Sequence, residues 1–269
     1  MAATPLLELR GIDKSFGPVQ VLHEVGLTVY PGEVTALVGD NGAGKSTLVK
    51  CVSGIYTIDA GSVTFDGNQV AIHTPRDASA LGIEVVYQDL ALCDNLDIVQ
   101  NMFLGREKTR GLVLDEPTME QMAGDTLASL SVRTVKSLRQ LVASLSGGQR
   151  QTVAIAKAVL WNSRVVILDE PTAALGVAQT AQVLELVRRL ADNGLGVVLI
   201  SHNMNDVFAV ADRVAALYLG RTAAEVKTTE VTHSQIVELI TAGRSGNLGL
   251  PPEKPASSEF ADITPGDDQ

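Results

Sequence analysis

Cysteine and aromatic residues are scarce in this sequence of 269 residues. Its two cysteines, Cys51 and Cys93, belong to no Cys-x-x-Cys pattern and no Cys/His ligand spacing. We therefore expect two reduced, partly buried thiols rather than a disulfide framework or a zinc site. Because aromatic residues make up only 4%, the core must consist mainly of Val, Leu, Ile and Ala. That composition favours buried parallel strands covered by helices.

Long apolar runs and a basic excess are also lacking. No run approaches the roughly 18–20 apolar residues that cross a bilayer, and residues 1–8 lack the segments of a signal peptide, so we expect none. If the protein acts at a membrane, it does so through another chain. The formal net charge is −10 and the pI is about 4.9. We expect no nucleic-acid partner, because such a partner needs a basic footprint.

Short apolar runs alternate with helical patterns along most of the chain. Buried strands are predicted at residues 34–38, 83–87, 165–168, 197–200 and 214–219. Helices are predicted at residues 44–52, 149–160 and 178–193. This alternation predicts an α/β fold, in which a parallel sheet carries helices on its faces.

Three parts of the chain depart from this alternation. Short strands at residues 6–12, 25–29 and 63–65, with a hairpin turn at Asp66-Gly67, indicate an antiparallel layer at the edge of the core. Residues from about 92 to 160 indicate a helical insert. From about residue 243 the composition shifts to Gly, Pro, Ser and acidic residues. We expect one domain over residues 1–245 and a mostly disordered tail over residues 246–269.

A glycine-rich loop between a predicted strand and a predicted helix fits the pattern G-x-x-x-x-G-K-[ST]. The loop reads Gly39-Asp40-Asn41-Gly42-Ala43-Gly44-Lys45-Ser46. Glycines let backbone N–H groups point at a phosphate chain, and the helix adds its positive N-terminal end. The predicted ATP-binding residues here are Gly39, Asn41, Gly42, Ala43, Gly44, Lys45, Ser46 and Thr47. Lys45 would reach the β- and γ-phosphates, and Ser46 would ligate Mg²⁺. The alternative is a turn that binds nothing.

Two carboxylates follow the buried strand at residues 165–168. Ligands of α/β sheets bind at the carboxyl ends of the strands. Asp169 is placed to hold Mg²⁺, and Glu170 is placed to orient or deprotonate the attacking water. Taken alone, the pair fits a solvated loop equally well.

The letters of residues 168–172 occur a second time, at residues 114–118. The stretch before Asp115 is too polar and too rich in glycine for a central strand. We therefore predict that Asp115 caps a helix of the insert and that Asp115-Glu116 has no catalytic role.

The segment Leu145-Ser146-Gly147-Gly148-Gln149 resembles the complete LSGGQ signature of the ABC ATPases. It opens a predicted helix, so its N–H groups form a second anion-binding helix end. The resemblance implies the P-loop NTPase core of this family, with an antiparallel β edge subdomain and an α-helical insert subdomain. It also implies a head-to-tail dimer, with ATP between the Lys45 side of one copy and the signature of the other. The implied contacts are Ser146, Gly147, Gly148 and Gln149.

Three further positions match the family in order and spacing. Gln88 resembles the glutamine that touches Mg²⁺ and the attacking water. His202 resembles the histidine that contacts the γ-phosphate, although by itself it fits a core or loop histidine. Phe16 resembles the aromatic residue that stacks on adenine, and its alternative is a core phenylalanine.

One position departs from the family pattern. Most ABC ATPases have an aspartate where Gly176 stands, and that aspartate helps to couple the two sites of the dimer. The segment at residues 171–176 and the stretch at residues 86–96 resemble the ATPase subunits of ribose- and fructose-type sugar importers. The resemblance covers about residues 5–243.

The resemblance implies an ATPase that uses ATP and Mg²⁺ to power import of a monosaccharide through a separate permease. It would lie peripherally on the cytoplasmic face of the inner membrane and serve a sugar-binding protein indirectly. Two alternatives stay open at this point. One is a soluble ABC ATPase that acts on ribosomes or DNA. The other is a low-turnover nucleotide-binding regulatory module, which only Gly176 suggests.

Overall fold

A twisted sheet of six strands forms the centre of the computed structural model, which describes residues 4–130 and 137–251. The strands, in spatial order, are β12 (Arg221–Lys227), β11 (Arg213–Tyr218), β3 (Val34–Gly39), β10 (Gly196–Ile200), β9 (Val165–Asp169) and β6 (Ile83–Val86). Five of them are parallel, and β12 pairs antiparallel with β11. The predicted parallel core is confirmed, and the antiparallel edge strand is an addition to it.

Each central strand buries both of its faces, which is why these strands read as unbroken apolar runs. Successive side chains point to opposite faces, so each strand contributes to two separate cores. In β9, for example, Val166 and Leu168 pack in one core and Val165 and Ile167 in the other. Burial on both faces fixes the register of each strand, because a shift by one residue would exchange the two sets.

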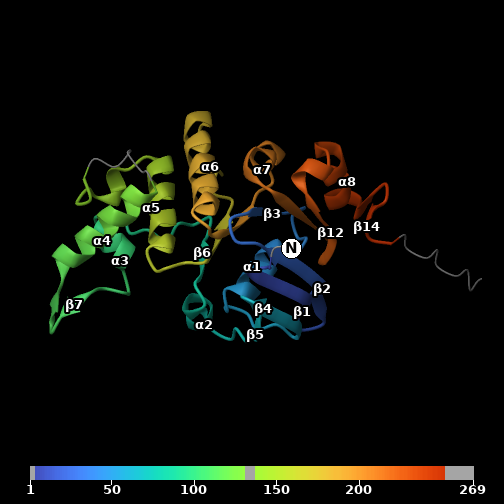
Figure 1. The fold of residues 1–269 in the computed structure, drawn as a ribbon, viewed down its shortest axis with the longest axis horizontal. Helices are drawn as coiled ribbons and strands as arrows, with labels where there is room; N and C mark the ends of the chain where they lie inside the picture. Colours follow the sequence, from blue (N-terminus) through green and yellow to red (C-terminus); the bar gives the residue numbers. More distant parts are fainter. Residues whose placement is uncertain (1–3, 131–136, 252–269) are drawn as a thin grey trace, which may run out of the picture.

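Helices cover the sheet from both sides. On one side lie α6 (Val177–Asp192), α7 (Met204–Val210) and α8 (His233–Ala242), along the top of Figure 1. On the other side lie α1 (Lys45–Val52) and a four-stranded antiparallel sheet. Helix α2 (Pro75–Ala80) connects this layer to β6. The fold class predicted from the alternation is therefore confirmed.

The antiparallel sheet has the order β2 (Val19–Val29), β1 (Leu7–Phe16), β4 (Ala60–Phe65) and β5 (Asn68–Val70). Its strands β1 and β2 are longer than predicted and meet in a tight hairpin, in which Phe16 pairs with Val19. The predicted turn at Asp66-Gly67 is confirmed, because Phe65 pairs with Asn68 and both turn residues have positive φ.

The helical insert forms an arm at the left of Figure 1. It contains α3 (Ile98–Phe103), α4 (Glu116–Ser129), a 3₁₀ turn (Val142–Ser144) and α5 (Gly147–Val159). A small hairpin of β7 (Thr109–Arg110) and β8 (Val113–Leu114) projects from it. Asp115 is the N-cap of α4 and accepts a hydrogen bond from the Thr118 backbone N–H. The second copy of the Leu-Asp-Glu-Pro-Thr letters is thus a helix start, as predicted.

The last described residues form a hairpin rather than the beginning of a tail. Strands β13 (Arg244–Ser245) and β14 (Leu248–Gly249) pair antiparallel after α8. The shift toward Gly, Pro, Ser and acidic residues predicts a tail from residue 246, and residues 246–251 differ from it because they form or follow this hairpin. The rest of that prediction, residues 252–269, lies outside the described residues. In the part that the structure describes, no helix is long and apolar enough to cross a membrane.

Candidate functional site

The predicted phosphate loop joins the end of β3 to the start of α1, at the carboxyl edge of the parallel sheet. Gly42 and Gly44 have φ angles of 82° and 101°, which only glycine adopts without strain. Gly44 is also the N-cap of α1 and offers no side chain that would compete for the first N–H groups of the helix. The loop therefore has the predicted form, a glycine-dependent turn from a strand into a helix N-terminus, and its binding of phosphate stays a prediction.

Close packing fixes the back of this loop. A Cβ atom on Gly39 would lie 2.7 Å from the Leu217 carbonyl oxygen, and one on Gly44 would lie 2.7 Å from the Leu22 side chain. The Gly220 N–H donates to the Ala43 carbonyl oxygen at 3.1 Å. The loop is therefore fixed from behind by β11, β2 and the β11–β12 turn.

The Lys45 ammonium lies inside the loop and donates to the carbonyl oxygens of Gly39 and Asp40, at 2.7 and 3.0 Å. Burial lowers the pKa of Lys45 from its ordinary value, while the nearby carboxylates of Glu170, Asp40 and Asp169 act in the opposite direction. A partly buried cation attracts an anionic phosphate more strongly than a fully hydrated cation does, because the surrounding dielectric constant is lower.

Two carboxylates face this cation from the end of β9. Burial raises the pKa of Asp169, and the negative charge of Glu170 raises it further, while Lys45 opposes the shift. Lys50 opposes the shift as well, but burial and Glu170 outweigh both lysines, so the pKa stays raised. A bound divalent cation would add positive charge beside these two carboxylates.

Glu170 lies within reach of His202 because the two residues follow neighbouring parallel strands. Ile200 of β10 is in register with Asp169 of β9. The Nδ1 atom of His202 is 2.8 Å from Glu170 Oε2. The Glu170 side chain is 16% exposed and the His202 side chain 75%. Glu170 has a φ of 50°, an uncommon backbone conformation for this residue type.

A buried aspartate, Asp206, ties the loops after β9 and β10 together. It accepts hydrogen bonds from Thr172 Oγ1 at 2.6 Å and from Asn203 Nδ2 at 3.0 Å. The sequence analysis missed this residue. A signal was available, since Asn203 and Asp206 stand three residues apart at a helix start, where such side chains fix the local turn.

One cavity brings the predicted phosphate- and metal-binding residues together. It is lined by Val21, Asn41, Gly42, Ala43, Gly44, Lys45, Ser46, Thr47, Gln88, Asp169, Glu170 and Ile200. A neighbouring cavity includes Gly39, Gln88, Glu170 and His202. Gln88 thus lies where the two cavities meet. The Ser46 hydroxyl, the Gln88 amide oxygen and the Asp169 carboxylate are hard oxygen donors, the type that Mg²⁺ prefers.

Phe16 lies at the tip of the β1–β2 hairpin. Its side chain is 42% exposed and packs edge-on against Tyr56, with ring centroids 5.0 Å apart. It is not a core phenylalanine, so that alternative is wrong. Stacking on adenine stays a prediction, which the exposure of the ring favours.

The signature segment starts α5, as its sequence predicts. Ser146 is the N-cap and forms a capping box with Gln149: the Ser146 N–H donates to Gln149 Oε1 at 2.9 Å, and the Gln149 N–H donates to Ser146 Oγ. Ser146 and Gly147 are exposed. Within the described residues, neither cavity at the phosphate loop is lined by a signature residue. Neither of these two cavities therefore includes the N-terminal end of α5 among its described lining residues.

Gly176 is the N-cap of α6 and has an ordinary extended backbone, with φ −73° and ψ 161°. A Cβ atom there would meet nothing within 4 Å. The fold does not require glycine at this position.

We therefore predict that Gly176→Asp raises the melting temperature slightly, because aspartate caps a helix better than glycine by a few tenths of a kcal/mol. Gly39→Ala is the contrasting control. Its new Cβ would press on the Leu217 carbonyl oxygen and should lower the melting temperature. Thermal unfolding followed by circular dichroism measures both, and a clear fall for Gly176→Asp would contradict the open space described here.

The family follows from comparison with known proteins. Residues 22–173 match the model of the ABC transporter family, and the chain belongs to this family.

Curated relatives cover nearly the whole chain. The xylose/arabinose import ATP-binding protein XylG of Sulfolobus acidocaldarius is 44% identical over 91% of this chain and 97% of that protein. The fructose import ATP-binding protein FrcA of Rhizobium meliloti is 44% identical over 91% of this chain and 96% of that protein. The ribose import ATP-binding protein RbsA 2 of Escherichia coli O157:H7 is 39% identical over 89% of this chain but only 47% of its own length.

Solved structures confirm the fold. An ATP-binding cassette of an ABC transporter in its ADP conformation aligns with a TM-score of 0.76 at 24% identity, over 88% of this chain and 95% of that one. A nucleotide-free ATP-binding cassette aligns with a TM-score of 0.75 at 24% identity, over 83% and 92% of the two chains.

Proposed function

We propose that this chain binds ATP and hydrolyses it at the cavity between the phosphate loop and the end of β9. The observation that carries the proposal is the convergence of Lys45, Asp169 and Glu170 on one cavity, with His202 beside Glu170. The loop amides and Lys45 hold the phosphates, and Glu170 orients a water molecule in line with the γ-phosphate and accepts its proton. His202, whose Nδ1 atom lies beside Glu170, contacts the γ-phosphate.

Mg²⁺ fits the oxygen donors of this site. Ser46, Gln88 and Asp169 would hold it, and the ion would supply positive charge that neutralises the phosphate oxygens. The raised pKa of Asp169 supports this assignment, because it reports a carboxylate whose charge burial and Glu170 leave poorly compensated.

The complete site requires two copies of the chain. We infer a head-to-tail dimer in which the N-terminal end of α5 in one copy closes over the ATP held by the other. The exposed Ser146 and Gly147, which line neither cavity at the phosphate loop of their own chain, support this arrangement. ATP favours the closed dimer, and loss of the γ-phosphate favours the open one.

A permease subunit is the partner that we propose for the groove beside the stretch after Gln88. This groove lies between β6 and the helical arm, and its lining includes Tyr87, Leu90, Leu104, Lys157 and Trp161. Burial lowers the pKa of Lys157, which places that cation at a partly dry surface. An apolar groove with a few charged side chains suits an amphipathic helix. Closure of the dimer would then move the permease.

The transported substrate that we propose is a sugar, and the direction is import. Support comes from the relatives named for xylose/arabinose, fructose and ribose import. The chain would lie peripherally on the cytoplasmic face of the inner membrane and serve a sugar-binding protein indirectly.

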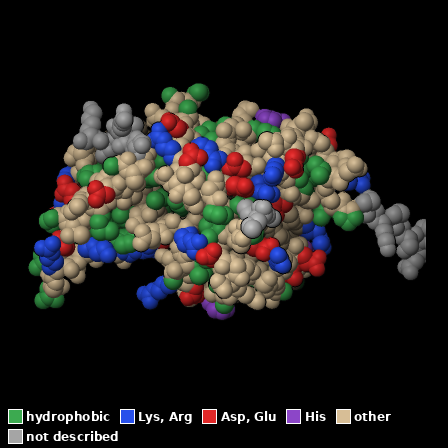
Figure 2. All heavy atoms as spheres, in the orientation of Figure 1, with side chains coloured by type: hydrophobic (Ala, Val, Ile, Leu, Met, Phe, Trp, Pro, Cys, Tyr) green, Lys and Arg blue, Asp and Glu red, His purple; other side chains and the backbone are tan. Residues whose placement is uncertain are grey.

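In Figure 2, acidic and basic side chains are mixed over the visible face, so the charge excess forms no single patch there.

Affinity purification of the tagged chain from membranes of the cells that naturally produce it tests this proposal. We expect a multi-span membrane protein to co-purify, and ATP-dependent sugar uptake in vesicles that contain the complex. Stable recovery with ribosomes or DNA, and none with a membrane protein, would contradict it.

A matched pair of variants tests the groove itself. Leu104 lines the groove and is 43% exposed, whereas Val237 on α8 is 45% exposed and lies outside it. Leu104→Glu should reduce recovery of the permease about tenfold, the effect of losing about 1.4 kcal/mol of binding. Val237→Glu should leave it unchanged. Equal recovery for both variants would remove the groove from the proposed interface.

A further inference from the structure

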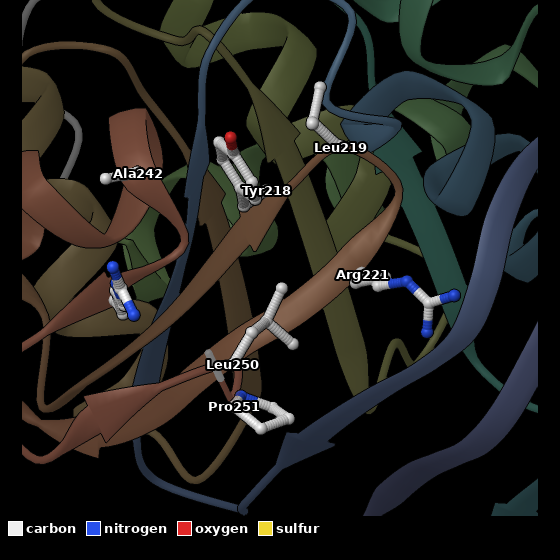
Figure 3. A pocket seen from close by; sticks show the side chains of 7 residues that line it. Tyr218, Leu219, Arg221, Ala242, Leu250 and Pro251 are labelled. Carbon is white, nitrogen blue, oxygen red and sulfur yellow. The ribbon is translucent and has the colours of Figure 1, made fainter. Parts of the chain in front are cut away.

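A pocket of about 630 Å³ lies between the β11–β12 turn and the C-terminal hairpin, away from the nucleotide cavity (Figure 3). In this view Tyr218 and Leu219 lie on one side, Leu250 and Pro251 on the other, and Arg221 at the margin. Arg244 completes the charged part of the lining. The lining thus combines apolar side chains with two cations.

Close contacts fix the walls of this pocket. A Cβ atom on Gly243 would lie 2.6 Å from the Tyr218 ring, and one on Gly249 would lie 2.3 Å from the Gly243 carbonyl oxygen. The Leu250 N–H donates to that same carbonyl oxygen at 2.8 Å. The hairpin therefore cannot move into the pocket without breaking these contacts, and the hollow is a built feature of the fold.

The two arginines lack acidic partners. Arg221 and Arg244 are both exposed, and in residues 4–130 and 137–251 neither guanidinium has a hydrogen bond or an ion pair. Most other described arginines are paired, and Arg139 and Arg188 each pair with two or more carboxylates. A pocket lined by apolar side chains and by two guanidinium groups without a carboxylate partner in the described residues suits a ligand that joins an apolar group to carboxylates.

The chain itself contains such a sequence directly after the pocket. Residues 252–269 carry five acidic residues and one lysine. Among them, Glu259-Phe260-Ala261-Asp262-Ile263 places an aromatic side chain between two carboxylates. We propose that the pocket binds residues 259–263 of the same chain, with Phe260 against the apolar side chains of the lining and the carboxylates of Glu259 and Asp262 beside Arg221 and Arg244.

The length of chain available permits this contact. Pro251 is part of the pocket wall, and Phe260 follows nine residues later. Nine residues span at most about 30 Å when extended and about 17 Å as an average coil, so either distance exceeds the width of such a pocket. A tether of this length gives an effective concentration in the millimolar range. An intrinsic dissociation constant of about 1 mM is therefore enough for substantial occupancy.

Binding of residues 259–263 in the pocket would affect the phosphate loop through the turn between β11 and β12, which contacts both. Leu219 and Gly220 form this turn, with φ angles of 43° and 76°. A Cβ atom on Gly220 would lie 2.2 Å from the Val21 carbonyl oxygen, and the Gly220 N–H donates to Ala43 in the loop. A ligand that holds this turn in place therefore favours the loop form that binds phosphate. Loss of the contact should weaken ATP binding about fivefold.

Fluorine NMR of the full chain tests the contact directly. The chain has five phenylalanines, and the Phe260 signal in protein labelled with 4-fluorophenylalanine is the one that Phe260→Leu removes. We expect the chemical shift of this signal to differ from its value in urea-unfolded protein. It should move toward that position in Arg221→Gln/Arg244→Gln, and also in 1 M NaCl, where the screening length falls to about 3 Å.

A matched control is Arg76→Gln, which removes an exposed arginine of α2 that also has no ion pair within the described part of the chain. This variant should leave the Phe260 signal in place. A wild-type signal at the unfolded position would overturn the proposal, and so would a signal that ignores the loss of both arginines. Because this readout needs neither turnover nor a permease, its failure would leave the proposed transport function untouched.

Binding of a fluorescent ATP analogue supplies the second readout. Phe260→Leu should raise its dissociation constant about fivefold, and Arg221→Gln/Arg244→Gln should produce the same rise. Combining the two changes should add nothing further, because both remove one contact. Fully additive effects would show that the arginines and Phe260 act separately and would overturn the coupling.

Discussion

Glu170→Gln should lower ATP turnover by about 10²–10⁴-fold, the range typical of a lost general base. Glutamine keeps the size of the side chain and its contact distance to His202 but takes no proton from the attacking water. The side chain is mostly buried beside the phosphate loop, at the carboxyl end of β9. The loop amides and Lys45 remain, so ATP binding should stay within a few-fold of the wild-type value. Phosphate release and equilibrium binding of an ATP analogue measure the two effects separately.

The chain provides a matched control for this substitution. Glu116→Gln makes the same change within the same Leu-Asp-Glu-Pro-Thr letters, but Glu116 is the first residue of α4 and pairs with Arg139 at 3.0 Å. Its turnover should equal that of the wild type. Equal turnover for Glu170→Gln and the wild type would show that another group receives the proton and would remove Glu170 from its assigned role.

The fate of the repeated Leu-Asp-Glu-Pro-Thr letters shows what sequence alone could predict. The five residues are identical, but only the copy that begins at Leu168 stands after three further apolar residues, and its first two residues end the central strand β9. A parallel strand that is buried on both faces has a continuous apolar sequence. These strands and the loops at their ends were therefore predictable. The helix start at Asp115 was predictable for the complementary reason, because its polar approach excludes a central strand.

Elements whose stability depends on tertiary contacts rather than on their own composition were harder to predict. Strand β12 reads Arg-Thr-Ala-Ala-Glu-Val-Lys, and this mixed composition does not indicate a strand. Its antiparallel pairing with β11 holds it in the extended conformation. The hairpin of β13 and β14 looks like a tail in sequence, yet Gly243 and Gly249 are there because Tyr218 and a carbonyl oxygen leave no room for a Cβ atom. Likewise, Asp206 joins two loops from a position that no motif marks. Each of these features depends on contacts that lie outside its own segment.

Mixing two inactive variants should restore ATP turnover, because the proposed dimer builds each site from both copies. Lys45→Ala removes the cation that holds the phosphates, and Ser146→Arg blocks the N-terminal end of α5 with a large side chain at an exposed position. Each variant alone should lose at least about 10²-fold in turnover, as sites that lose a main electrostatic contact do. In a mixed dimer both defects fall on one site, and the other site is intact. With random pairing and independent sites, an equal mixture should regain about a quarter of wild-type turnover.

The pairing of defects makes this experiment specific for a shared site. Lys45 and Glu170 line the same cavity in one chain, so Lys45→Ala mixed with Glu170→Gln leaves a defect on the phosphate-loop side of both sites and should restore nothing. Rescue by Ser146→Arg but not by Glu170→Gln would therefore place Ser146 opposite the loop of the other copy. Failure of both mixtures, with wild-type melting temperatures for all three variants, would mean that a single chain encloses its nucleotide. In that case the signature would act on the nucleotide of its own protomer. The 3₁₀ turn and α5 would then have to move toward the phosphate loop of the same chain.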